Sequence, residues 1–200
     1  MNRISQRQLD GLTPQVRPFL AQIAAAARTP ALTLLSGLAE GADRHVAELA
    51  LDAGYALHAV LPFARDTYAR DFTGAASRAQ FGELLARAER VTELSGRPGF
   101  SAQAYRRAGH ALLEESDVLL AVWDGLPAQG AGGTAEVVNE ACRRRIPVIH
   151  VSTQPRTSPV LIWQRQGSAT RGRSAYEAAP SRRCGPSQVA AMVSHLMRAG

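Results

Sequence analysis

The sequence contains no lysine, so all 23 basic residues are arginine. This absence excludes a Walker A lysine, a Schiff-base lysine and a lysine general base. Any contact between a side-chain cation and a phosphate must therefore come from arginine, whose guanidinium group can bind in a bidentate manner.

Cysteines and long apolar segments are also scarce. The two cysteines, Cys142 and Cys184, match no metal-ligand spacing, and Cys142 falls in a helical pattern that favours a small core residue. His58 and His150 lie within strand patterns and are interpreted as structural, so we expect no metal site. The longest apolar runs are too short to cross a bilayer, and the N-terminus has no secretory signal pattern. These features predict a cytoplasmic protein with no membrane partner.

Positive charge is concentrated near the C-terminus. Residues 1–150 contain 16 arginines and 16 acidic residues, whereas residues 151–200 contain seven arginines and one acidic residue, Glu177. A basic tail can attract nucleic acid or acidic lipid, but a mobile, solubilising tail is the simpler interpretation. The segment 164–187 is rich in Arg, Ser, Gly and Pro, so we expect a loop or disorder that is dispensable for folding, followed by a terminal helix over 188–198.

The alternation of apolar runs and helical spacing predicts an α/β fold. The expected strands are 31–36, 55–61, 117–123 and 146–152, with weaker ones at 91–94 and 160–163. Helical patterns cover 41–53, 78–89, 105–115 and 134–145. We therefore expect a Rossmann-like domain over residues 1–152, with one parallel sheet and helices on both faces, and a basic extension over residues 153–200.

The strongest candidate site follows the expected strand 117–123. Asp124 and Gly125 end this strand, and the residues GAGGTAE at 130–136 open the next helix. Ligands bind at the carboxyl ends of strands in open parallel sheets, and glycines let a phosphate approach the N–H groups of the following helix. Thr134 supplies a hydroxyl and Glu136 a carboxylate in that first turn. An ordinary loop with a capping threonine is the alternative.

A second candidate segment, SGLAEGAD at residues 36–43, follows the expected strand 31–36. Glu40 is placed to meet a ribose hydroxyl, whereas Asp43 is explained equally well as a helix N-cap. A third segment follows the strand 55–61, where Arg65 offers a cation for phosphate and Tyr68 a ring for a base, with a solvated connector as the alternative. The GxGxxG fingerprint is absent, which disfavours a standard NAD dehydrogenase.

These motifs resemble those of the SLOG superfamily, which includes SMF/DprA DNA-processing proteins, LOG-type phosphoribohydrolases and bacterial sensor domains. The resemblance covers roughly residues 31–152 and is closest to stand-alone bacterial SLOG domains. The matching residues are SGLAEGAD, HAVLPFARDTYARDF, DVLLAVWDG, GAGGTAE and IPVIHV. The resemblance implies a Rossmann-like fold that binds a nucleotide-derived ligand, such as an NAD-related or ADP-ribose-like molecule.

The resemblance also implies roles for individual residues. It places Gly132, Gly133 and Thr134 at the phosphate and Glu136 near the ribose; in LOG enzymes the equivalent glutamate helps to cleave the base–ribose bond. The LOG motif PGGxGTxxE is altered here, because the proline is missing and the Thr-to-Glu spacing is one residue shorter. The LOG arginine motif is also absent, and these two departures count against hydrolase activity. Residues 1–12 contain no strand-length apolar run and no glycine at the usual Gly-His-Arg-type turn, so we expect the first strand to be degenerate or missing, and with it part of the usual ligand cradle.

Three functions therefore remain open. The first is binding or sensing of a nucleotide derivative, including a nucleoside monophosphate, with no cofactor required. The second is N-glycosidic bond cleavage like that of a LOG phosphoribohydrolase or a nucleoside deoxyribosyltransferase, with Glu136 as the catalytic residue. The third is DprA-like nucleic-acid binding, which the charge-neutral body of the domain disfavours. The expected ligand-binding residues are Ser36, Gly37, Glu40, Gly41, Asp43, Arg65, Tyr68, Asp124, Gly125, Gly130, Gly132, Gly133, Thr134 and Glu136.

Two kinds of protein partner are expected. A homodimer would form through the helix 101–115, where the small residues Ala104, Ala108 and Ala111 share a face with Leu112. Because a sensor must pass its signal on, an effector protein is the second expected partner.

Overall fold

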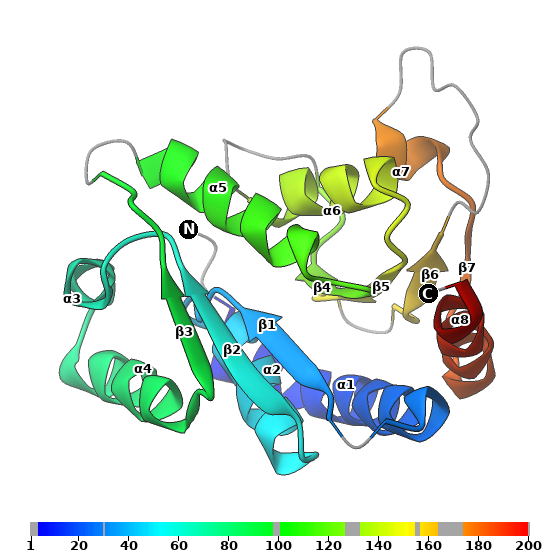
Figure 1. Ribbon diagram of the computed structural model, residues 1–200, viewed down its shortest axis with the longest axis horizontal. Helices are drawn as coiled ribbons and strands as arrows, with labels where there is room; N and C mark the ends of the chain where they lie inside the picture. Colours follow the sequence, from blue (N-terminus) through cyan, green and yellow to red (C-terminus); the bar gives the residue numbers. More distant parts are fainter. Residues whose placement is uncertain are drawn as a thin grey trace.

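The computed structural model describes residues 4–29, 31–97, 101–126, 133–154, 157–163 and 174–199. The chain alternates strands and helices, which confirms the predicted α/β class (Figure 1). In the first half, β1 (Thr33–Ser36), β2 (Ala56–Leu61) and β3 (Arg90–Glu93) form a parallel sheet in that order. In the second half, β4 (Leu119–Trp123) pairs in parallel with β5 (Val148–Ser152).

The hydrogen-bonded strands form two sheets rather than the single parallel sheet expected from the sequence. The second sheet continues from β5 to the antiparallel strands β6 (Val160–Ile162) and β7 (Ser181–Arg183). All four major predicted strands are present, but within the described residues β1 and β4 do not pair. Side-chain packing joins the two sheets instead, because Leu34 of β1 and Leu120 of β4 pack against the same core cluster.

Helices cover both faces of the strands. Figure 1 shows α5 (Ser101–Glu114) and α6 (Thr134–Arg143) on one side, and α1 (Gln6–Ala27) and α2 (Ala42–Asp52) on the other. Shorter elements connect β2 to α4 (Ala75–Arg87): these are α3 (Arg65–Tyr68) and the 3₁₀ turn η1 (Ala69–Asp71). Among the described helices, none combines the length and apolar character that crossing a bilayer would require.

The first helix holds the main core together. Ser5 caps α1 by accepting a hydrogen bond from the Gln8 backbone N–H, while the Gln8 side chain accepts from the Ser5 N–H. The helix continues through Pro14 and Pro18, and its buried face packs against α2, β5 and the C-terminal helix α8 (Pro186–Ala199). The buried members of this cluster include Leu12, Val16, Phe19, Val46, Leu49, Ile149, Val151, Val189 and Met192.

The C-terminal region is part of the fold, which corrects the expectation of a separate extension after residue 152. The strands β6 and β7 extend the second sheet, and α8 lies along α1. The helix α7 (Ala175–Ala178) is tied to α6, because the Ala175 N–H donates to Asn139 Oδ1 at 2.6 Å. The predicted disorder at 174–187 is therefore wrong, and residues 164–173 lie outside the described residues. Composition did not predict this order because it cannot show that β7 pairs with β6 or that α7 packs against α6.

The packing of α8 leads to a stability prediction. Met192 is fully buried between α8 and the core, whereas Met197 on the same helix is 58% exposed. We expect Met192→Ala to lower the free energy of unfolding by about 2–5 kcal/mol, because it removes buried methylene groups and leaves a cavity. Met197→Ala, the matched control, should change it by less than about 0.5 kcal/mol. Urea unfolding of the two variants gives the comparison, and equal effects would contradict the packing of α8.

Two of the four residues predicted to form a homodimer face on α5 are buried inside the chain, whereas Ala111 and Leu112 are half-buried. Ala104 and Ala108 are 3% and 5% exposed, and Ala104 belongs to the core cluster around β2. Leu113, one residue from the expected face, is also buried. Ala104 and Ala108 therefore allow α5 to approach its own sheet, and the homodimer stays a prediction.

Candidate functional site

The loop between β1 and α2 has a defined shape that begins at Ser36. The buried Ser36 hydroxyl accepts a hydrogen bond from the Leu38 N–H at 3.1 Å. Leu38 is fully buried with a positive φ of 52°, an uncommon conformation for a leucine that the surrounding structure must enforce. This turn brings Gly37 beside Asp43, because a Cβ at Gly37 would lie 3.7 Å from Asp43 Oδ2. The loop therefore presents a glycine and a carboxylate together.

Arg44 fixes this loop from inside the protein. Its side chain is fully buried; Nε donates to the Leu38 carbonyl at 3.0 Å, and Nη1 donates to the Ser77 carbonyl at 2.7 Å. The guanidinium carbon lies 4.0 Å from the ring centroid of Phe72, so the cation also contacts an aromatic face. Desolvation lowers the pKa of Arg44, and the nearby carboxylate of Glu40 opposes this shift. Arg44 thus links α2, α4 and the loop after β1.

The helix α2 begins differently from the prediction. Gly41, with a φ of 104°, is the N-cap, and Asp43 lies in the first turn of the helix, so Asp43 is not the N-cap. The Asp43 residue is solvent-accessible, yet many protein atoms surround its carboxyl group, and this desolvation raises its pKa against the lowering effects of the Ala39 N–H and Arg44. Glu40 is half-buried close enough to Arg44 to affect its pKa. Two carboxylates therefore flank this helix start.

The two residues expected to contact a ligand after β2, Arg65 and Tyr68, both contact other side chains of the protein. The Arg65 guanidinium is paired with Glu93 at the end of β3, and this hydrogen bond lowers the pKa of the Glu93 carboxyl group. Tyr68 is 1% exposed, and its ring packs against Phe63, Phe72, Phe81 and Tyr105. The Tyr68 ring is therefore a core element and is not available to stack on a base. The sequence did not reveal this because the segment looked polar.

The loop after β4 leads directly to the start of α6. Asp124 Oδ1 accepts from the Leu126 N–H at 3.0 Å, and Gly125 has a φ of 84°. Residues 127–132 lie outside the described residues, and the ligand contacts predicted for Gly130 and Gly132 fall in this range. Gly133 is the N-cap of α6, so no side chain of the N-cap residue accepts a hydrogen bond from the first turn. Thr134 is the first residue of the helix and not its N-cap. A Cβ at Gly133 would meet nothing within 4 Å, so the space in front of this N-cap is open among the described residues.

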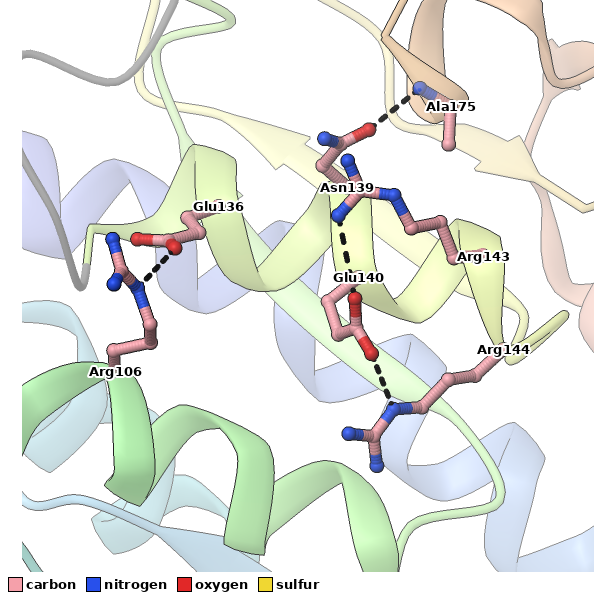
Figure 2. Close-up of polar contacts among 7 residues, drawn as sticks. All are labelled: Arg106, Glu136, Asn139, Glu140, Arg143, Arg144 and Ala175. Carbon is pink, nitrogen blue, oxygen red and sulfur yellow. Dashed lines mark hydrogen bonds and ion pairs between the residues drawn. The ribbon is translucent and has the colours of Figure 1, made fainter. Parts of the chain in front are cut away.

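Glu136 in the first turn of α6 forms an ion pair with Arg106 of α5. Arg106 Nε lies 2.5 Å from Glu136 Oε1, and Figure 2 shows the two side chains bridging the helices. One turn further along α6, Glu140 accepts hydrogen bonds from Arg143 and Arg144. Those arginines lower the pKa of Glu140. Glu140 is thus paired within its own helix, whereas Glu136 is held from a neighbouring one.

Adjacent residues of α5 connect the carboxyl ends of the two sheets. The ring of Tyr105 lies 5.9 Å from that of Phe63, which follows β2, and the Tyr105 hydroxyl donates to Asp71 Oδ2 at 2.6 Å. The next residue, Arg106, reaches Glu136 at the start of α6. The end of β2 and the start of α6 therefore lie at the same part of α5. The parallel pairing of β1 with β2 also places the loops after these two strands at one edge of the first sheet.

Other titratable residues have structural positions. Cys142 is buried, and burial raises the pKa of its thiol to about 11, which fits the predicted core role. His58 is buried and lies 2.9 Å from Thr92 Oγ1, and His150 lies 3.0 Å from the Trp123 carbonyl. Within the ranges that the structure describes, no cluster of His, Cys, Asp and Glu could hold a metal ion.

The sequence of this chain matches no family model and no curated protein. The functional conclusion therefore rests on the geometry of this edge and on the residues around it.

Proposed function

We propose that the protein binds a nucleotide-derived ligand, such as an ADP-ribose-like molecule or a nucleoside monophosphate, across the loops after β1 and β4. The phosphate lies at the N-terminus of α6, next to Gly133 and Thr134. Ribose hydroxyl groups meet a carboxylate of Glu136 or Glu40. The single observation that supports this proposal best is the glycine N-cap of α6, where a Cβ at Gly133 would meet none of the described atoms within 4 Å.

The physical argument combines the helix terminus with the charges near it. The first N–H groups of α6 have no acceptor within the helix, and the positive end of the helix dipole favours an anion there. A glycine N-cap leaves these groups without a competing side-chain acceptor, unlike a serine, threonine or aspartate cap. Because Arg106 partly neutralises Glu136, that carboxylate does not repel a phosphate as a free one would.

One observation favours a second candidate, the cleavage of an N-glycosidic bond. Glu136 is paired with an arginine from a different helix, and a carboxylate held in this way can orient a ribose or act as an acid or base. The sequence predicted no arginine partner for Glu136, since Arg106 lies 30 residues away along the chain. The enzymatic and the binding functions use the same site and differ in whether the base is released.

Replacing Glu136 with glutamine separates the two functions. For a binding protein, we expect a modest loss of nucleotide affinity, because the amide keeps an acceptor oxygen, and no base release by either wild type or variant. A catalytic glutamate would give base release by the wild type that the variant loses almost completely while it still binds. Calorimetry with ADP-ribose, NAD and AMP measures binding, and chromatography measures the released base.

Glu140→Gln is the matched control. It makes the same substitution on the same helix but removes a carboxylate that pairs only with Arg143 and Arg144 among the described residues. Its affinity should equal that of the wild type. Equal losses for Glu136→Gln and Glu140→Gln would contradict a specific role for Glu136.

A further inference from the structure

A second hollow lies along the outer face of α5. It is a cavity of about 440 Å³, lined by residues that follow β3, including Ser95, and by one face of the helix. This volume falls within the range of small-molecule sites, roughly 300–1,000 Å³. No described residue of the loops after β1 and β4, which form the candidate nucleotide site, lines it. Arg106 is the residue that contributes to both places.

The charges along this cavity are unevenly distributed. Gln103, Arg106 and Arg107 lie at one end, with His110 on the next turn, whereas Glu114 lies at the far end. Arg107 and Glu114 are seven residues apart, which corresponds to about 10 Å along a helix that rises 1.5 Å per residue. The carboxylate is therefore too distant to neutralise the arginines, and the first two turns of the cavity are positively charged.

Both arginines have unused hydrogen-bond donors. Arg107 forms no hydrogen bond or ion pair with any residue in the described ranges. Arg106 uses Nε for Glu136, which leaves its two terminal nitrogens without a partner in the same part of the chain. Arg107 differs in this respect from Arg17 and Arg90, two exposed arginines that pair with Asp52 and Glu115. Arg107, which has no counter-charge among the described residues, and the free terminal nitrogens of Arg106 together favour an anion between them.

We propose that this cavity binds the phosphate or diphosphate group of a second small molecule, held by Arg106, Arg107 and Gln103. A guanidinium group has five N–H donors in a planar arrangement that matches phosphate oxygens, so two arginines and an amide can surround such a group. Since Arg106 also holds Glu136, an anion in the cavity acts on the orientation of that glutamate. The cavity is thus connected to the candidate nucleotide site through one side chain.

Titration of the full-length protein with inorganic pyrophosphate tests the proposal. We expect saturable binding that Arg107→Gln weakens on the order of 10- to 100-fold, because charge-assisted hydrogen bonds are among the stronger ones. Arg87→Gln is the matched control: Arg87 is an exposed arginine of α4 outside the cavity, so its loss changes the net charge equally. This control should bind pyrophosphate as the wild type does.

Two outcomes would overturn the proposal. One is the absence of saturable pyrophosphate binding, and the other is an equal loss in Arg107→Gln and Arg87→Gln, which would indicate a general charge effect. The same titration with Gly133→Val keeps this test independent of the nucleotide site, because that variant retains the cavity. Arg107→Gln should in turn keep its affinity for ADP-ribose, so each site can fail without the other.

Discussion

Gly133→Val is expected to lower the affinity for a nucleotide by about two to four decades while the fold stays intact. A phosphate held by backbone N–H groups must come within about 3 Å of the chain, and a branched side chain at the N-cap of α6 occupies that space. Hydrogen bonds to a charged group contribute roughly 1.5–3 kcal/mol each, so the loss of two corresponds to this range at about 1.4 kcal/mol per decade. The fold should tolerate the change because a Cβ at Gly133 meets nothing within 4 Å.

The control for this variant is Gly82→Val. Gly82 is exposed on α4, and a Cβ there also meets nothing within 4 Å. Calorimetry with the same nucleotide should give wild-type affinity for Gly82→Val and strongly reduced affinity for Gly133→Val, with unchanged circular dichroism in both. Wild-type affinity in Gly133→Val would show that the phosphate lies elsewhere.

Arg44→Ala is expected to have the largest effect on stability. The substitution removes the donors to the buried carbonyl of Leu38 and the partly buried carbonyl of Ser77, and it removes the cation that lies over Phe72. The unsatisfied Leu38 carbonyl costs about 1–3 kcal/mol, and the space left by the buried side chain adds to this cost, so we expect the free energy of unfolding to fall by roughly 2–6 kcal/mol. Because Arg44 also holds the loop after β1, the variant should lose nucleotide affinity in addition to stability.

Guanidinium chloride unfolding measures the effect, and Arg87→Ala is its control. Arg87 is exposed on α4, so its replacement should change the free energy of unfolding by less than about 0.5 kcal/mol. If Arg44→Ala unfolds at the same denaturant concentration as Arg87→Ala, the network around Leu38 does not stabilise the fold.

The sequence predicted the elements whose hydrophobic pattern is strong. The run before Asp124 is apolar at nearly every position, and it forms β4; the spacing of Val138, Ala141 and Cys142 likewise forms the buried face of α6. The sequence could not predict how the strands group into two sheets, since periodicity describes the burial of a strand but not its neighbours. It also gave the wrong account of the C-terminus, because composition does not show that Val189 and Met192 meet α1.

The candidate site was predicted only in part. The sequence predicted the loops at Gly37 and Gly133, because a glycine that follows an apolar run can be recognised from neighbouring residues alone. Arg44 and Arg106 were missed, since their partners Leu38, Ser77 and Glu136 are brought to them by the fold. The polar composition of its segment also concealed Tyr68, whose neighbours in the core come from the turn after β2, from α4 and from α5.

The most direct test of nucleotide binding is calorimetric titration of the folded wild-type protein with ADP-ribose, NAD and AMP. The account predicts saturable, one-to-one binding of at least one of these ligands, with affinity that falls as Gly133 is replaced by valine. The absence of binding by all three, in protein shown by circular dichroism to be folded, would contradict a nucleotide site at the start of α6.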